Sequence, residues 1–321
     1  MKAIYLEKKG RAEALVFGDV PQPTPQADEI LVKVHASAVM PTELDWFPTF
    51  NQASGQPRPF PIVLSHELSG TVESLGADAR GFTVGQEVYG LNDWFTNGAQ
   101  AEYCIASPKS LAAKPKSLSH AEAAVVPISA LTAWQALFEK GRLEKKQRVL
   151  IHGAAGGVGS FAVQMARWRG AHVTATASGG NIDFVRALGA DVVIDYHKTR
   201  FEDVVCDMDV IVDGVGGETL ERSWKVLEKE GRLITIVGEN TQAPLSQRSR
   251  DAFMLVRADG AQLAEIARLI DSGELRVFLE AVYPLEEAKD AFARAQKGKM
   301  RGKIALSVLQ DTLVSENPKN P

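Results

Sequence analysis

The sequence predicts an α/β protein with two domains, one rich in short strands and one built on a doubly wound parallel sheet. Up to about Ser119, short alternating apolar segments are separated by proline- and glycine-rich turns, which is typical of a β-rich domain. From about His120, helical patterns alternate with buried apolar runs, as in a parallel sheet covered by helices on both faces. The 321 residues, of which 45% are hydrophobic, are enough for two cores.

Each element is predicted from the spacing of its apolar residues. The first part predicts strands over 3–6, 30–37, 68–76, 85–91 and 101–106. The second part predicts strands over 148–153, 172–177, 192–196, 209–216 and 232–238, and helices over 121–141, 160–170, 181–189 and 219–231. The last part predicts helices over 260–275 and 286–298, with strands over 277–285 and 303–308.

Composition argues against several classes of function. The formal charge of -4 and the pI near 5.9 disfavour a nucleic-acid binder, because such proteins usually carry a basic surplus. The apolar runs are too short and too interrupted to span a membrane. Cys104 and Cys206 are too few for a disulfide framework, and the first 15 residues place charges where a signal peptide is apolar. We therefore expect a cytoplasmic protein that acts on small molecules.

The most informative motif lies between a predicted strand and a predicted helix. Residues 153–159 read GAAGGVG, and glycines here permit a tight turn, admit a ligand close to the backbone and leave N–H groups facing it. A pyrophosphate suits this arrangement, and the spacing is close to the dinucleotide fingerprint. The alternative is a tight strand-to-helix connection without a ligand, but the second strand that follows the helix favours binding. The candidate cofactor residues of the turn are Gly153, Ala155, Gly156, Gly157, Val158 and Gly159.

The residues after the next predicted strand favour NADP(H) over NAD(H). An Asp or Glu at this point would bind the ribose hydroxyls of NAD and repel a 2′-phosphate. Here the chain reads SGGN from Ser178 to Asn181, and the first carboxylate is Asp183. Ser178 and Asn181, together with Tyr196 after the following strand, are able to hydrogen-bond phosphate oxygens. Asn181 is equally suited to be a helix N-cap.

Six segments together resemble the medium-chain dehydrogenase/reductase superfamily, and within it the zinc-independent quinone oxidoreductases. They are residues 59–76, 81–90, 130–137, 149–167, 187–196 and 302–306. The resemblance covers nearly the whole chain and implies a GroES-like catalytic domain and a Rossmann domain inserted into it. The expected domains are residues 1–121 with 256–321 for the GroES-like part, and 122–255 for the Rossmann part. By the same resemblance we expect a homodimer joined near the strand at 232–238.

The zinc-dependent members of this superfamily provide a contrast. They bind the metal with a thiolate, a histidine and a second thiolate, leaving one position open. In this chain Met40 matches the first thiolate, His66 is kept beside Glu67, and Ile128 matches the second thiolate. A thioether, one histidine and an isoleucine do not form a plausible zinc site, so no metal is expected.

Without a Lewis acid, reduction of an activated acceptor is easier than oxidation of a simple alcohol. A quinone or an α,β-unsaturated carbonyl accepts hydride directly, and the enzyme need only position it and stabilise the oxygen that gains charge. Thr42 is the candidate donor to that oxygen, with a turn residue as the alternative. His66 is a candidate proton donor, and a buried histidine satisfied by Glu67 is the alternative. A catalytically quiet NADPH-binding or structural protein is the other function class.

Further site residues are carried over from the resemblance by position. The substrate pocket is expected to be apolar and aromatic, because flat acceptors stack on rings. Its candidates are Met40, Trp46, Phe47, Phe50 and Trp94. The additional cofactor candidates are Thr132, Asp213, Gly214, Val215, Val237, Gly238, Phe253 and Lys303.

Overall fold

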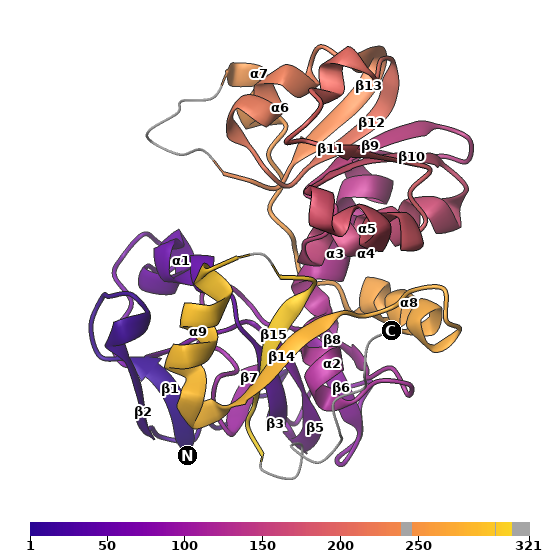
Figure 1. Ribbon diagram of the computed structural model, residues 1–321. Coiled ribbons are helices and arrows are strands. Elements are labelled where there is room, and N and C mark those ends of the chain that lie inside the picture. Colours follow the sequence, from indigo (N-terminus) through magenta and orange to yellow (C-terminus); the bar gives the residue numbers. More distant parts are fainter. Residues whose placement is uncertain (239–245, 299, 310–321) are drawn as a thin grey trace. The chain divides into compact units, whose positions relative to one another are not determined.

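The chain forms two compact units in a computed structural model that describes residues 1–238, 246–298 and 300–309. Unit 1 consists of Met1–Pro127, Ala258–Asp271 and Val277–Pro321. Unit 2 consists of Ile128–Arg257 and Ser272–Arg276, and Figure 1 labels the elements of both. The domain boundaries expected from the sequence lie after residue 121 and after residue 255. Nothing in the sequence indicates that residues 272–276 return to unit 2. Residues 310–321 of the expected first domain lie outside the described part.

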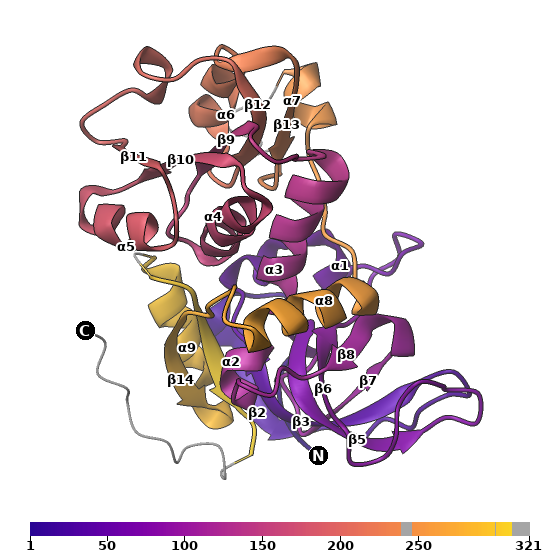
Figure 2. The same cartoon turned by 90° about the vertical axis from the view of Figure 1, so that its right-hand side faces the viewer.

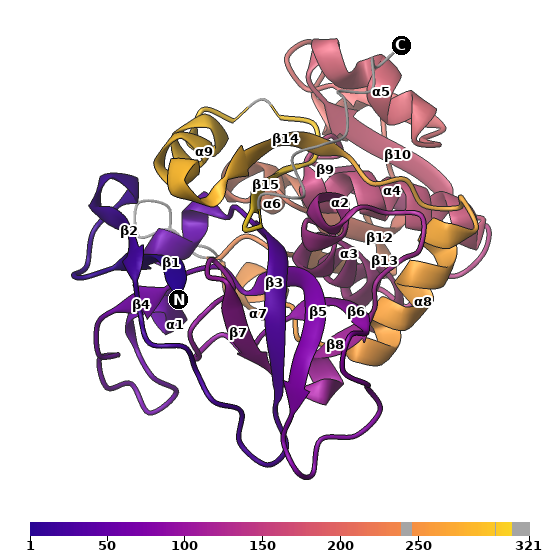
Figure 3. The same cartoon turned by 90° about the horizontal axis from the view of Figure 1, so that it is seen from below.

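Unit 1 contains two sheets. The larger has the strand order β14-β15-β3-β5-β6-β8, with β7 paired to β3, and the smaller has the order β2-β1-β4. Figure 3 shows β3, β5 and β6 side by side, as their antiparallel pairing requires. The strands are β1 Lys2–Leu6, β2 Leu15–Asp19, β3 Ile30–Ala38, β4 Ile62–Val63, β5 Glu67–Leu75, β6 Glu87–Leu91, β7 Tyr103–Ala106, β8 Leu111–Ala113, β14 Leu279–Pro284 and β15 Lys303–Ser307. The helices are α1 Phe47–Phe50, α2 His120–Ala124, α8 Gly260–Asp271 and α9 Ala288–Gln296, with short 3-10 turns that include Pro41–Asp45.

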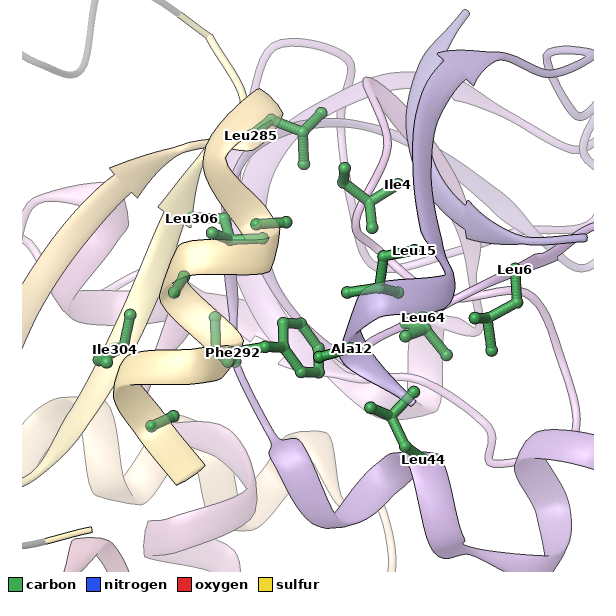
Figure 4. Close-up of a cluster of buried hydrophobic side chains, with 14 of the residues drawn as sticks. Ile4, Leu6, Ala12, Leu15, Leu44, Leu64, Leu285, Phe292, Ile304 and Leu306 are labelled. Atoms are coloured by element: carbon green, nitrogen blue, oxygen red, sulfur yellow. The ribbon is translucent and has the colours of Figure 1, made fainter. Parts of the chain in front are cut away.

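The C-terminal elements complete the core of unit 1. Helix α9 buries Ala288, Ala291, Phe292 and Ala295, the spacing of one helix face. Figure 4 shows Phe292 facing Ala12 near the start of the chain, in a cluster that also holds side chains of β1 and β15. Residues about 280 positions apart in the sequence therefore share one core, so unit 1 is incomplete without the end of the chain.

Unit 2 is built on a five-stranded sheet with the order β11-β10-β9-β12-β13, in which all neighbours are parallel. Helix α4 packs on β9 and β10 (Figure 2). The strand order reverses between β9 and β12, which is the point where ligands bind in sheets of this kind. The strands are β9 Arg148–His152, β10 His172–Ala177, β11 Val192–Asp195, β12 Met208–Asp213 and β13 Leu227–Thr235. The helices are α3 Pro127–Trp134, a π-helical turn Gln135–Lys140, α4 Gly157–Arg169, α5 Ile182–Ala187, α6 Gly217–Ser223 and α7 Gln247–Asp251.

Two buried glutamines hold the segments by which the chain leaves and re-enters unit 2. The Gln135 amide donates to the Arg257 carbonyl at 2.9 Å and accepts from the Arg257 N–H at 3.1 Å. The Gln164 amide makes the same double contact with Arg276, at 3.1 and 2.8 Å. Each glutamine amide thus pairs with both the N–H and the carbonyl of one backbone residue, as a neighbouring β-strand would.

The structure differs from the sequence-based elements in three places. The helix predicted over 219–231 ends at Ser223, because the residues from Leu227 onward enter β13 beside β12. The helix predicted over 121–141 is divided into α2, α3 and the π-helical turn, and α3 begins at Pro127, whose ring suits a first helical position. Strands β2, β4 and β8 and helices α1 and α7 were not predicted. Among the described residues, no helix has both the length and the apolar composition to cross a membrane.

Candidate functional site

The glycine turn forms a cradle at the carboxyl end of β9. Gly153 has φ of +72°, a left-handed conformation that glycine adopts without strain. A Cβ on Gly159 would lie 2.2 Å from the Gly153 carbonyl oxygen, so helix α4 and the turn pack backbone to backbone. A cavity of about 190 Å³ lies here, lined by the turn together with Val212, Gly214 and Ile236. The first-turn N–H groups of α4 have no carbonyl partners within the helix, so the cradle suits an anion such as pyrophosphate.

The three residues expected at the 2′-phosphate lie together. The Asn181 amide donates to the Ser178 hydroxyl at 3.2 Å, and the Tyr196 N–H donates to the carbonyl of Ala177, the residue before Ser178. Tyr196 is exposed, and the four residues that follow β10, Ser178 to Asn181, include no Asp or Glu. Asn181 does occupy the N-cap position of α5, but its side chain makes no capping hydrogen bond.

A cation that was not predicted lies at the same edge. Lys198 follows β11, its side chain is 80% exposed, and its Nζ lies 3.7 Å from the Asp195 carboxylate. The same carboxylate faces Gly179, since a Cβ there would lie 2.9 Å from Asp195 Oδ2. Lys198 is therefore close to the Ser178–Asn181 turn, although it is 20 positions away in sequence.

The carboxyl ends of β12 and β13 bring together most of the other cofactor candidates. Gly214 lines the cavity, and a Cβ on the neighbouring Gly216 would lie 2.7 Å from a methyl group of Val237. Phe253 pairs with the last residue of β13, and its ring edge lies 3.8 Å from the Cβ position of Gly238. Val215, Gly238 and Phe253 are exposed, so this edge offers apolar surface to a ligand.

Three cofactor candidates have side chains occupied within the protein. The Asp213 carboxylate is fully buried and accepts from the N–H groups of Val215 and Gly216 and from the Thr235 hydroxyl. Asp213 therefore shapes the turn at Gly214 instead of presenting its carboxylate to a ribose. The Thr132 hydroxyl donates to the Ile128 carbonyl one helical turn back, at 2.6 Å. Lys303 lies in unit 1, where its ammonium is buried against the Glu67 carboxylate.

His66 is the centre of a buried polar cluster in unit 1. It is 2% exposed, and its Nε2 lies 3.4 Å from the Glu43 carboxyl. The neighbouring Glu67 carboxylate forms an ion pair with the buried Lys303 ammonium. Burial raises the pKa of Glu43 to about 8, and burial together with the charge of Arg58 lowers the pKa of His66 to about 4. At neutral pH both groups are uncharged, so this contact is not an ion pair.

Ser65, next to His66, has a strained backbone. Its φ of +65° is left-handed, and its N–H donates to both oxygens of Glu43, at 2.8 and 3.0 Å. We expect Ser65→Gly to raise the free energy of unfolding by about 1 kcal/mol, because glycine adopts this conformation without strain. Urea unfolding measures the change. Ser69→Gly, in strand β5, is the control and should destabilise. A loss of stability in Ser65→Gly would show that the serine hydroxyl contributes more than the strain costs.

The raised pKa of Glu43 predicts a pH-dependent stability. The folded state keeps the proton up to about pH 8, whereas the unfolded chain loses it near 4.5, so stability falls as the pH rises between these values. The buried His66, His120 and His152 have lowered pKa values, so each makes stability rise as the pH rises. This effect ends near pH 6.5, where the histidines of the unfolded chain have lost their protons. We expect stability to fall between pH 6.5 and 8 by up to roughly 1.4 kcal/mol per pH unit.

Glu43→Gln should remove this slope, since an amide has no proton to lose. The measurement is urea unfolding at several pH values from 6.5 to 8. Glu73→Gln, at an exposed position, should retain the slope of the unsubstituted protein. An unchanged slope in Glu43→Gln would mean that Glu43 is ionised in the folded state at neutral pH.

The aromatic candidates of the substrate pocket divide into two groups. Trp46 and Trp94 contact edge to face with ring centroids 5.4 Å apart, and Trp94 also packs on the ring of His66. Phe47 is 57% exposed, Met40 is half-buried, and Thr42 presents an exposed hydroxyl on the turn after it. Phe50 is partly buried: its ring packs on the core of unit 1 and under the Lys9 ammonium, so it contributes to stability.

The residues present do not fit a catalytic zinc ion. The position of the first thiolate holds Met40, and His66 Nε2 is directed at an uncharged Glu43 instead of an open coordination position. Ile128, at the second position, has no donor atom. Within residues 1–238, 246–298 and 300–309, no three His, Cys, Asp or Glu side chains lie close enough to hold a metal ion.

Two family models match the chain. The alcohol dehydrogenase GroES-like domain matches residues 26–133, and the zinc-binding dehydrogenase model matches residues 188–306. The mitochondrial NAD(P)H oxidoreductase of Mus musculus is 33% identical over 96% of this chain and 89% of its own length. The 2-methylene-furan-3-one reductase of Solanum lycopersicum is 31% identical over 95% of this chain and 79% of its own.

The chain also resembles solved structures of oxidoreductases. The quinone oxidoreductase from Coxiella burnetii superposes with a TM-score of 0.87 at 29% identity, covering 96% of this chain and 99% of its own. The expectation of a cytoplasmic protein is contradicted, because the Mus musculus relative and other curated relatives are named as mitochondrial or chloroplast proteins. Organellar transit peptides are amphipathic and lack the apolar stretch of a secretory signal, so the absence of such a stretch does not exclude them.

Proposed function

The chain belongs to the quinone oxidoreductase family of the medium-chain dehydrogenase/reductase superfamily, and from this premise we propose a zinc-independent reductase that uses NADPH. The family makes the chain an oxidoreductase with a nicotinamide cofactor and a small-molecule substrate. The proposed substrates are quinones and α,β-unsaturated carbonyl compounds. The names of the relatives support both acceptor classes.

One observation carries the proposal: a glycine cradle suited to a dinucleotide occurs in a chain where two of the three metal-ligand positions hold other residues. Gly153 and Gly159 shape the cradle, whereas Met40 and Ile128 replace two metal ligands. Such a site is able to hold a hydride donor but has no Lewis acid to ionise an alcohol. The favoured substrate is therefore one that accepts hydride without metal activation.

The role proposed for unit 1 is to hold the acceptor and stabilise its oxygen. A bound reduced nicotinamide supplies hydride, and the acceptor oxygen gains negative charge as a result. We assign to the exposed Thr42 the donation of a hydrogen bond to such an oxygen, and to Trp46 and Trp94 the ring surface that a flat acceptor contacts. His66 is buried and uncharged at neutral pH, so we assign it the support of Trp94 instead of direct proton donation.

The proposed preference for NADPH is supported by the edge beyond β10 and β11. Ser178, Asn181 and Tyr196 supply neutral donors, and Lys198 supplies the positive charge that no arginine provides. We also propose a homodimer joined along β13, which ends the five-stranded sheet in the part of unit 2 that the structure describes. Sedimentation velocity should give twice the chain mass of 34.8 kDa.

The decisive experiment is to follow nicotinamide absorbance while metal-stripped protein is mixed with NADPH or NADH and a panel of quinones and enones. We expect chelator-insensitive consumption that is faster with NADPH. Tight binding of NADPH without consumption would favour the catalytically quiet alternative. Activity that needs added zinc would overturn the proposed mechanism.

A further inference from the structure

Two loops of unit 1 carry aromatic side chains on neighbouring segments. The first contains Trp46 and Phe47, and the second contains Trp94 and Phe95. We call these four residues the aromatic platform. The two tryptophans contact each other, while Phe47 and Phe95 are 57% and 37% exposed. Exposed aromatic surface of this kind commonly marks a binding site.

Arg58 connects the two loops from the inside. It is 9% exposed, and its Nη1 donates to the carbonyls of Pro48 and Thr49 in α1, at 3.2 and 3.4 Å. Its Nη2 donates to Asn97 Oδ1 at 3.0 Å, which belongs to the second loop. Asn97 Oδ1 also accepts from the Val63 N–H at 3.2 Å, so the second loop is attached to β4 as well.

These contacts require the geometry of arginine. The guanidinium donates in two directions at once from a rigid plane, whereas a lysine ammonium is a single point that cannot reach both loops in the same way. Burial lowers the pKa of Arg58, and the negative charge of Asp93, the residue before Trp94, opposes this effect. A buried guanidinium is costly unless its donors are satisfied, so the hydrogen bonds to Pro48, Thr49 and Asn97 account for its position.

We propose that Arg58 is the positioning residue that joins the two loops into one aromatic platform, and that the platform selects flat acceptors with an extended apolar part. This inference rests on the proposed reductase function. A separated pair of loops would still bind a small acceptor at one ring, but it would lose the combined surface that a bicyclic acceptor contacts.

The test compares menadione, a bicyclic quinone, with 1,4-benzoquinone in Arg58→Lys and Asn97→Ala. Each variant breaks the link from one side. We expect KM for menadione to rise about tenfold in both, which corresponds to the loss of one good aromatic contact. KM for 1,4-benzoquinone and the Kd of NADPH should each change less than twofold. The near-UV circular dichroism of the Trp46–Trp94 pair should weaken in parallel.

Arg80→Lys is the matched control, because Arg80 is an exposed arginine of unit 1 whose contacts are local: it donates to the Ala77 and Ala79 carbonyls and lies 4.0 Å from the Asp78 carboxylate. It should change neither KM. Guanidinium ion, at a concentration that does not unfold the protein, should restore menadione binding to Arg58→Ala. Equal changes in KM for both quinones would overturn the proposal. So would an unchanged KM for menadione in variants whose near-UV tryptophan signal is weakened.

The outcome separates this inference from the proposed function. If the unsubstituted protein reduces no acceptor, the proposed function fails, but menadione binding can still be followed by quenching of tryptophan fluorescence. In that case weaker menadione binding in Arg58→Lys, with unchanged binding in Arg80→Lys, supports the role of Arg58. Equal menadione binding in all three proteins overturns it.

Discussion

Gly159→Ala is expected to abolish measurable NADPH binding, with an affinity at least about 100-fold below that of the unsubstituted protein. The added Cβ would lie 2.2 Å from the Gly153 carbonyl oxygen and 2.7 Å from Ala154 Cα. Both atoms belong to the backbone, so the turn itself must move and the N–H groups at the start of α4 lose their common direction. Isothermal titration calorimetry measures the loss.

The control for this substitution is Gly180→Ala, at a position where an added Cβ meets no atom within 4 Å. Its stability should be unchanged, whereas Gly159→Ala should also lose about 1–3 kcal/mol of unfolding free energy through overpacking. NADPH binding that survives in a folded Gly159→Ala protein would place the cofactor somewhere other than the glycine turn.

Ser178→Asp is expected to reverse the cofactor preference. A carboxylate at the end of β10 would repel a 2′-phosphate and accept hydrogen bonds from the ribose hydroxyls of NADH. Two negative charges a few ångströms apart near a protein surface repel by a few kcal/mol, so NADPH affinity should fall roughly 30- to 100-fold. NADH affinity should stay the same or rise.

Ser178→Asn provides the comparison, because it has nearly the shape of aspartate without the charge. It should change NADPH affinity less than Ser178→Asp does. The measurement is the Kd of each cofactor by fluorescence, repeated at higher ionic strength, where the repulsion weakens. Equal Kd values of NADPH for Ser178→Asp and the unsubstituted protein would show that the 2′-phosphate is bound elsewhere.

The features that could be predicted from the sequence depend on neighbouring residues. The change from short strands to alternating strands and helices is local, and so is the glycine turn with its flanking strand and helix. The parallel sheet of unit 2 follows from that pattern, whereas the reversal of strand order between β9 and β12 is known only from the structure. The helix expected over 219–231 failed because its end pairs with β12, which is a tertiary effect.

The features that could not be predicted depend on residues far apart in the chain. Glu43 lies three residues after Met40, which suggested a lost metal site, but only the fold shows that the Glu43 carboxyl contacts His66. Arg58 lies in a polar loop with no sequence signal, and its partners lie on two other segments. Asp213 ends a strand where a ribose contact is expected, yet its carboxylate holds the turn below the surface.

The discontinuous composition of unit 1 has a consequence for the order of folding on the ribosome. Helix α9 and strand β15 supply part of the core, β15 pairs with β3 and β14 pairs with β15, but these are the last of the described elements to be synthesised. The sheet of unit 2 is complete in sequence once β13 has emerged. The nascent chain therefore carries this complete sheet while residues 1–127 still lack β14, β15 and α9, and this first part of unit 1 must remain protected from aggregation until they emerge.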